Sequence, residues 1–175
     1  GWFSKGLLFR WLGGPETPLA LHGAPIPEEA RDLVARAMQG LEGHTLIDLH
    51  VHLAGRDAKN GNWINPRLEN PLHPLDFARS QIFRHAGFGD PESKDVVWIH
   101  RLNGFAEGLP LPYEGHLLSF DHRYAPDGSL DLDASEFFVP NGWAQYAADL
   151  YPERMRPACS IHPYRPDAVQ ELERC

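Results

Sequence analysis

"TLIDLHVHLAG", residues 45–55, is the stretch that decides the predicted fold, because it places two histidines one residue apart within a run of aliphatic residues. Such a run is typical of a β-strand, whose side chains alternate between two faces. One face is purely aliphatic and is expected to lie under helices; it consists of Ile47, Leu49, Val51 and Leu53. The other face becomes polar towards its C-terminal end and consists of Leu46, Asp48, His50 and His52.

The rest of the chain alternates between helical and strand patterns. Apolar residues at helical spacing predict helices within residues 27–43, 75–88, 93–109, 140–155 and 165–175. Two further strands are predicted within residues 114–129 and 156–166. Strands that alternate with helices are typical of a parallel sheet built from βαβ units. The predicted fold class is therefore α/β, with residues 1–43 as an N-terminal extension and helix and residues 44–175 as the main domain.

Composition and charge exclude several functional classes. The 175 residues carry a net charge of -8 and no dense basic cluster, which argues against nucleic-acid binding. No apolar run approaches the roughly 18 residues that a membrane span requires. Two cysteines do not make a disulfide framework, so a cytoplasmic location is expected. Residues 1–14, "GWFSKGLLFRWLGG", leave two alternatives: an interfacial amphipathic helix, or a terminal helix that packs on the domain or on a second subunit.

The two histidines of the strand indicate a metal site. In barrels and open α/β sheets, functional sites form at the C-terminal ends of the strands, which is where His50 and His52 lie. Two imidazoles at positions i and i+2 can reach one cation at roughly 2.0–2.1 Å for zinc. Asp48, one step deeper on the expected face, would either accept the second N–H of a histidine ligand or lie below the metal. The alternative is a pair of histidines that are hydrogen-bonded to their surroundings without a metal.

The strand resembles a known family. "LIDLHVHLAG" is similar to the first strand of the amidohydrolase superfamily, whose members are metal-dependent hydrolases built on a (β/α)8 TIM barrel. "LLSFDH" and "FFVPNGWAQYAADLYPERMRPACSIHPYRPDAVQELERC" resemble the branch that contains aminocarboxymuconate-semialdehyde decarboxylase, often called amidohydrolase 2. The resemblance covers residues 44–175. It implies a TIM-barrel fold that is truncated here to about the first three βα units.

The resemblance also implies which residues act. His50 and His52 correspond to metal ligands, and the cation would be zinc, with manganese or iron as alternatives. His162, at the end of the third strand, falls near the mouth of such a site and would act on substrate or bind a second metal; otherwise it only caps the strand. The family's general base would lie beyond this sequence, and Asp48 or Asp121 would have to replace it.

Three other side chains follow predicted strands and have competing interpretations. Asp121 and His122 either belong to the site or anchor the loop after the second strand, and we favour anchoring. Arg165 either holds a substrate carboxylate or lies on the surface. His100 lies within a helical pattern, where packing or surface exposure is expected.

The family's remaining ligands, two histidines and an aspartate from later strands, would lie beyond Cys175. Three parallel strands also leave open edges, so we expect either the missing C-terminal half of the barrel or a homo-oligomer to complete the fold. The sequence thus predicts the N-terminal part of a metal-dependent hydrolase that uses metal-activated water on a small molecule. The alternatives are a non-oxidative decarboxylase of the same superfamily and a non-catalytic α/β binding domain.

Overall fold

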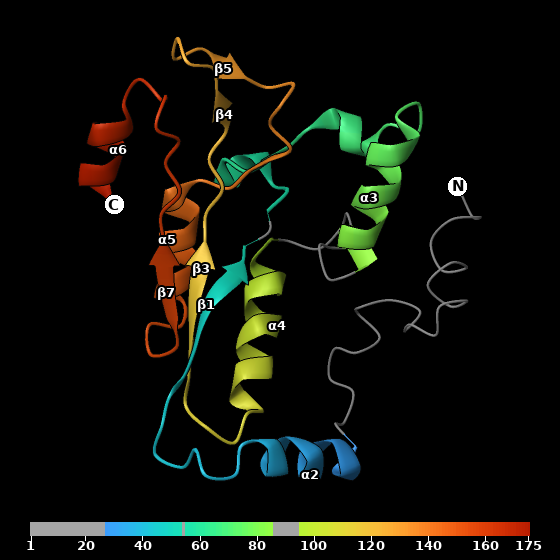
Figure 1. The fold of residues 1–175 in the computed structure, drawn as a ribbon, viewed down its shortest axis with the longest axis vertical. Coiled ribbons are helices and arrows are strands. Elements are labelled where there is room, and N and C mark those ends of the chain that lie inside the picture. Colours follow the sequence, from blue (N-terminus) through green and yellow to red (C-terminus); the bar gives the residue numbers. More distant parts are fainter. Residues whose placement is uncertain (1–26, 54, 86–94) are drawn as a thin grey trace.

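The computed structural model describes residues 27–53, 55–85 and 95–175 (Figure 1). The segment 1–14, for which two interpretations were open, lies outside these residues. The predicted helices appear as α2 (Glu28–Ala37), α3 (Pro74–His85), α4 (Asp95–Glu107), α5 (Asn141–Asp149) and α6 (Ala168–Arg174). The predicted strands appear as β1 (Leu46–His52), β3 (Tyr113–Leu118) and β7 (Met155–Ala158). Short elements complete the order: η2 (Ala58–Asn60), β2 (Trp63–Ile64), η3 (Pro66–Glu69), β4 (Arg123–Tyr124), β5 (Leu130–Asp131) and β6 (Phe137–Phe138).

The three main strands form one parallel sheet in the order β1–β3–β7. The predicted α/β class with parallel strands is therefore confirmed. Among the described residues the sheet stays open and does not close into a barrel, with β1 and β7 as its two edges. Two antiparallel pairs, β2 with β6 and β4 with β5, were not predicted because each strand is only two residues long.

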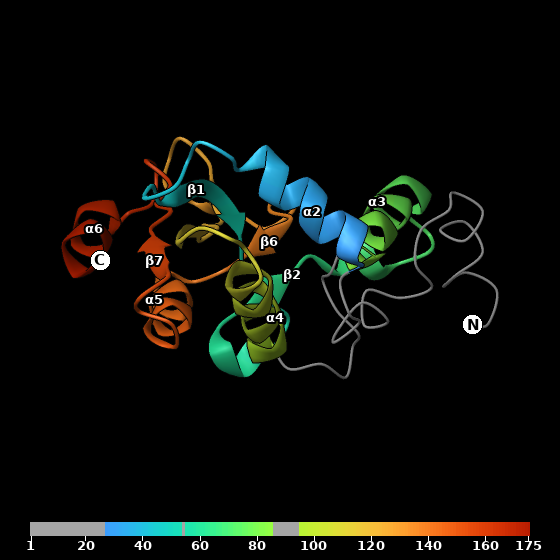
Figure 2. The same cartoon turned by 90° about the horizontal axis from the view of Figure 1, so that it is seen from below.

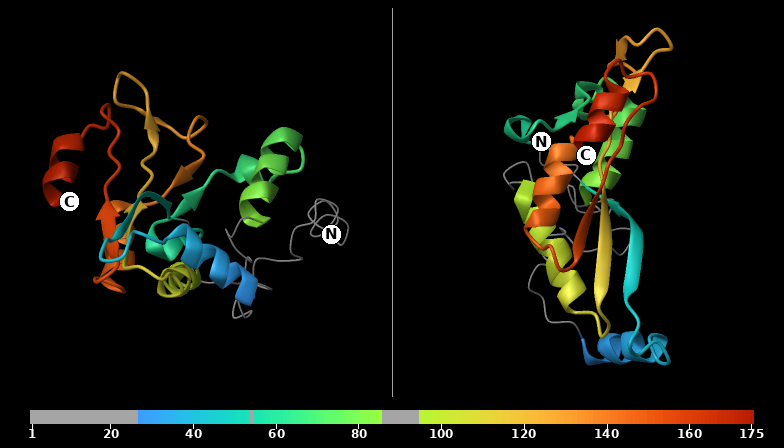
Figure 3. Two further views of the ribbon diagram at one scale, coloured as in Figure 1. Left: turned by 60° about the horizontal axis from the view of Figure 1, so that its bottom comes forward. Right: turned by 90° about the vertical axis from the view of Figure 1, so that its left-hand side faces the viewer.

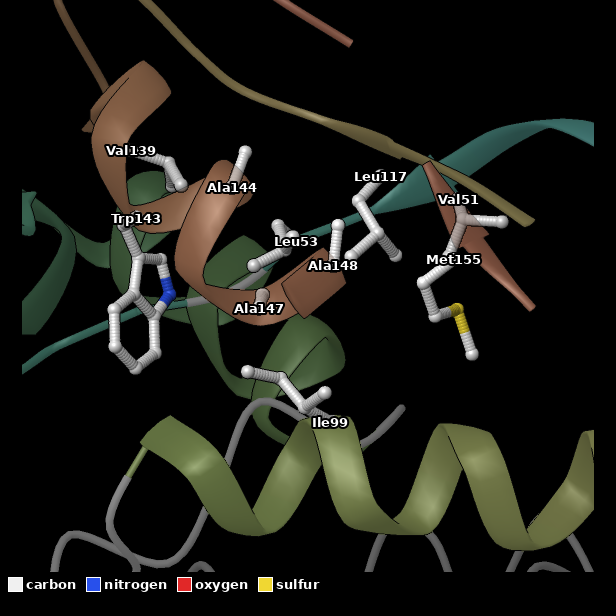
Figure 4. Close-up of a cluster of buried hydrophobic side chains, with 10 residues drawn as sticks. All are labelled: Val51, Leu53, Ile99, Leu117, Val139, Trp143, Ala144, Ala147, Ala148 and Met155. Carbon is white, nitrogen blue, oxygen red and sulfur yellow. The ribbon is translucent and has the colours of Figure 1, made fainter. Parts of the chain in front are cut away.

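Helices α4 and α5 lie on the same side of this sheet (Figures 2 and 3). The core forms between them and the strands (Figure 4), with Leu117 and Ala144 fully buried. Small side chains at Ala144, Ala147 and Ala148 let α5 approach the sheet closely. The complete cluster is Val51, Leu53, Ile99, Leu117, Val139, Trp143, Ala144, Ala147, Ala148 and Met155.

Only part of the aliphatic face that the sequence predicts in β1 is covered. Val51 and Leu53 are buried, whereas Ile47 is 60% and Leu49 is 65% exposed. The cause is an irregularity in the pairing of β1 with β3: Asp48 aligns with Gly115, but Val51 aligns with Leu117. Between these two aligned pairs β1 advances by three residues and β3 by two. The one extra residue in β1 makes a β-bulge. Because alternation has a period of two, the bulge exchanges the two faces of the strand, and the predicted common face is corrected accordingly.

Candidate metal centre

His50 and His52 lie side by side at the C-terminal end of β1. Their Nε2 atoms are 3.0 Å apart, and their rings stand edge to face with centroids 4.6 Å apart and an interplanar angle of 79°. Both side chains are exposed. The prediction that both imidazoles emerge together from the end of a parallel strand is confirmed by this geometry.

This spacing fits a shared cation. Two nitrogens that bind the same tetrahedral zinc ion, each at roughly 2.0–2.1 Å, lie about 3.3 Å from each other. The observed 3.0 Å separation needs only a slight opening of the pair to reach that value. The same distance also permits an N–H of one neutral imidazole to donate to the other, which is the alternative without a metal. In residues 27–53, 55–85 and 95–175, no group of three or more His, Cys, Asp or Glu side chains is gathered closely enough to hold a metal ion.

The ring of His52 is held in place from the neighbouring strand. It stacks on Phe120, just past the end of β3, with centroids 5.2 Å apart and planes 18° from parallel. Trp98 of α4 donates a hydrogen bond to the His52 carbonyl oxygen at 3.4 Å. Partial burial of the ring lowers the pKa of His52, and repulsion from His50 lowers it further. The neutral imidazole, which is the form that binds metals, is therefore favoured at neutral pH.

Asp48 lies away from this pair, on the other face of the sheet. It aligns with Gly115 before the bulge, and its Oδ2 accepts a hydrogen bond at 3.3 Å from the hydroxyl of Tyr113, which packs against the core. Its Oδ1 accepts the backbone N–H of His50 at 3.0 Å. Burial raises the pKa of Tyr113 to about 12, and the Asp48 carboxylate adds to this effect. Asp48 thus closes the bulge that turns His50 towards His52, whereas its catalytic role stays a prediction.

A second polar cluster forms where β3 and β7 end. The Asp121 side chain is only 4% exposed and accepts the backbone N–H groups of His122 at 2.8 Å and His162 at 2.9 Å. Arg165 Nη1 lies 3.4 Å from both of its carboxylate oxygens. The Asp121 backbone N–H donates to Ser160 Oγ at 3.2 Å. The loop-anchoring role favoured for Asp121 agrees with these contacts, since its carboxylate ties the loop after β3 to the loop after β7.

Arg165 is fully engaged by acidic groups of the chain itself. Its Nε and Nη2 donate to the two Asp167 oxygens at 2.6 Å and 3.1 Å, while Nη1 faces Asp121. The hydrogen bonds to Asp167 are the main cause of a raised pKa of Arg165, and the Asp121 charge adds to it. Only 17% of the side chain is exposed. This geometry leaves little of the guanidinium for a substrate carboxylate.

His122 is enclosed by aromatic rings. It stacks on Phe138 with centroids 4.2 Å apart and planes 6° from parallel, and Trp63 meets it edge to face at 5.1 Å. Burial lowers the pKa of His122; the Asp121 charge opposes this effect and Arg165 reinforces it. Its Nδ1 atom is buried without a hydrogen-bond partner. The ring therefore acts as a neutral, apolar packing element in the loop after β3.

His162 stands apart from the histidine pair. Its ring lies between Tyr124 and Tyr164, with centroids 5.6 Å from each, and its Nδ1 accepts the backbone N–H of Tyr164 at 3.2 Å. This contact leaves the ring proton on Nε2 in the neutral form. His162 follows β7, and β3 separates β7 from β1. Its ring contacts are with these two tyrosines, and within the described residues it belongs to no group of three metal-ligating side chains, so its role on substrate or on a second metal stays a prediction.

The loop that follows the histidine strand has an anchor that sequence reasoning missed. Asp95, at the first turn of α4, is buried and accepts backbone N–H groups from Arg56 at 2.8 Å and Asp57 at 3.0 Å. Its Oδ2 also accepts from the amides of Asn60 at 3.2 Å and Asn62 at 2.8 Å. An aspartate in the first turn of a helix is explained by its favourable interaction with the positive end of the helix dipole. The sequence therefore gives no indication of these partners, which lie 33 to 39 residues away along the chain.

His100 points outward from α4, as expected for a packing or surface residue. Its side chain is exposed, and its Nδ1 lies 2.7 Å from the hydroxyl of Tyr151. The contact joins α4 to the turn after α5 and takes no part in the sites described above.

Comparison of the chain with protein-family models, with characterised proteins and with solved structures finds no match. The described helices are also too short or too polar for any of them to traverse a lipid bilayer. The interpretation of the site therefore depends on its geometry.

Proposed function

We propose that this chain supplies the metal-binding strand of a metal-dependent hydrolase of the amidohydrolase type, with His50 and His52 as ligands of a divalent cation, zinc in the first place. The observation that supports this proposal is the 3.0 Å separation of the two Nε2 atoms on exposed rings at the C-terminal end of a parallel strand. The resemblance of "LIDLHVHLAG" to the first strand of that superfamily supports it independently.

The surrounding residues prepare the pair for this role. Phe120 fixes the plane of the His52 ring, and Asp48 holds the backbone at the bulge so that His50 turns to the same side. The lowered pKa of His52 keeps a lone pair available at neutral pH. Zinc bound in such a site would act as a Lewis acid and would lower the pKa of a bound water molecule to about 7. Because two imidazoles do not complete the three protein ligands of a catalytic zinc, at least one further ligand is required from outside the pair.

Hydrolysis of a small molecule is the reaction that we favour over decarboxylation. A decarboxylase of the same superfamily would use an arginine to hold the substrate carboxylate, and Arg165 is the arginine for which the sequence left that role open. The hydrogen bonds of Arg165 with Asp121 and Asp167 compete with the binding of a substrate carboxylate. A non-catalytic binding domain remains the other candidate, because it would keep the histidine pair without metal-dependent turnover.

Zinc binding is the first experiment. Titration of the purified, metal-depleted protein with zinc in a calorimeter should give one site per chain, and His50→Ala and His52→Ala should each weaken zinc affinity by at least about 10-fold. His73→Ala is the matched control, since His73 is also an exposed histidine, located just before α3. Far-UV circular dichroism checks that all variants remain folded.

The proposal fails if zinc binds equally well to the wild type and to the His50→Ala, His52→Ala double variant.

A second assay separates a hydrolase from a binding domain. The zinc-loaded protein is incubated with a panel of small esters, amides and lactones, and hydrolysis that stops with a chelator and in both histidine variants supports the enzyme. Tight zinc binding without any turnover supports the binding domain instead.

A further inference from the structure

The chain has two cysteines, and the fold brings both of them to one junction between β7 and α6. Cys159 follows β7 directly, and Cys175 follows α6. Both are exposed and both carry free thiols. Figure 1 shows α6 beside the end of β7, and the views in Figures 2 and 3 agree.

Asn141 forms the centre of this junction. Its Oδ1 accepts the backbone N–H of Ser160 at 2.9 Å, and its Nδ2 donates to the Ser160 carbonyl oxygen at 3.2 Å. The same Nδ2 donates to Glu171 Oε1 at 2.7 Å. One buried amide thus joins the residue after Cys159 to the middle of α6.

Cys175 lies one helical turn beyond Glu171 on the same side. Its backbone N–H donates to the Glu171 carbonyl oxygen at 3.2 Å, and its Sγ is 4.0 Å from Glu171 Oε1, the oxygen that Asn141 binds. Burial is the main cause of a raised pKa of Cys175, followed by the charge of Glu171 and then by the Cys159 thiol. Cys159 precedes Ser160 and Cys175 contacts Glu171, so the Asn141 amide, which binds both Ser160 and Glu171, holds the two cysteines at the same junction.

From this geometry we infer that Cys159 and Cys175 are a reversible redox pair, which closes to an intramolecular disulfide under oxidising conditions. The bond would fasten α6 to the end of β7. Glu171 is 3.9 Å from Arg165, so the fastened helix adjoins the Asp121 and Arg165 cluster. The inference does not depend on the proposed metal site.

Glutathione disulfide is a sufficient oxidant, and the reaction balances without any other reagent. One protein thiolate attacks a sulfur of glutathione disulfide, which forms a mixed disulfide and releases one glutathione. The raised pKa of Cys175 disfavours its thiolate at neutral pH, so this first attack is expected from Cys159. The second thiolate then attacks the Cys159 sulfur and releases a second glutathione. Both protein thiols are oxidised, and one glutathione disulfide is reduced to two glutathione thiols.

The test is mass spectrometry of the purified protein after incubation with glutathione disulfide. The expected product is a monomer that has lost two hydrogens, carries no glutathione and returns to its original mass with dithiothreitol. Proteolysis without reductant should release one peptide pair that joins Cys159 to Cys175. The bond closes a loop of about 15 residues and should raise the thermal midpoint of the oxidised protein by about 5–10 °C.

Two single variants serve as matched controls. In Cys175→Ser the mixed disulfide at Cys159 has no partner thiol, so the protein should retain one glutathione; Cys159→Ser should react more slowly, at Cys175. Three outcomes overturn the inference: a wild-type product with glutathione on each cysteine, a disulfide-linked dimer on a non-reducing gel, and two thiols that stay reduced while Cys175→Ser becomes glutathionylated.

Discussion

Removal of the Asp121 carboxylate is the sharpest test of how this fold is held together. The side chain is 4% exposed and receives two backbone N–H groups, from His122 and His162, as well as the guanidinium of Arg165. Asp121→Ala removes the acceptor of all of these donors at a site that is largely shielded from solvent. The loops after β3 and β7 then lose their common anchor.

The magnitude follows from the number of donors. Each buried N–H that loses its partner costs about 1–3 kcal/mol, and removal of one member of a buried ion pair costs about 3–5 kcal/mol. The two costs overlap, because one carboxylate serves all three donors, and Arg165 retains its bonds to Asp167. We therefore expect Asp121→Ala to lower the free energy of unfolding by about 3–4 kcal/mol, a large share of the total for one domain.

Urea unfolding followed by tryptophan fluorescence measures this loss, since Trp143 lies in the core. Asp127→Ala is the control. Asp127 lies in the turn between β4 and β5, and its carboxylate accepts hydrogen bonds from the Ser129 backbone N–H at 3.0 Å and the Ser129 hydroxyl at 2.6 Å. Its removal should cost no more than about 1 kcal/mol. A loss below about 1 kcal/mol for Asp121→Ala, equal to that of the control, would refute the anchoring role.

Two further predictions concern the loops beside the histidine strand. The pKa of His122 is lowered in the folded state, so below about pH 6.5 the unfolded state binds the proton more readily and the free energy of unfolding falls as the pH decreases. Urea midpoints measured from pH 8 to pH 5 should therefore fall less in His122→Phe than in the wild type. The phenylalanine ring keeps the stack on Phe138 but cannot titrate. Gly55→Ala should destabilise by about 1–3 kcal/mol, because its Cβ would overlap the buried Asn62 side chain, whereas Gly104→Ala in α4 meets open space and should stabilise by up to about 1 kcal/mol. Equal midpoints for the two glycine variants in a thermal melt would contradict this account.

The secondary structure was largely predictable from the sequence. Within the described residues, the five predicted helices and the three predicted strands form where the periodicity of apolar residues predicts them, and residues 86–88 and 93–94 of two predicted helices lie outside that part of the chain. Periodicity is a local property, and it survives folding because each element must bury one side. It did not predict which apolar residues stay exposed: Leu33 in α2 is at helical spacing yet 61% exposed, since no residue of this helix is buried.

The candidate site was predictable in part. The side-by-side emergence of His50 and His52 needs only one strand and its alternation, and it was correct. The place of Asp48 was wrong, because the bulge depends on how β1 pairs with β3, and no local pattern reports that pairing. The contacts of Asp121 with partners about 40 residues later in the chain were equally beyond a local pattern.

By itself, the sequence determined the α/β alternation and the two imidazoles at the end of a strand, because both follow from side-chain direction and apolar spacing within a few residues. Only the tertiary structure decided that Asp48 turns to the opposite face, that Arg165 binds the chain's own carboxylates and that Asn141 joins the segment after β7 to α6. Each of these features depends on strand register or on segments that the burial of a common core brings together. The free energy of that burial comes from contacts between distant parts of the chain, so no short stretch of sequence determines it.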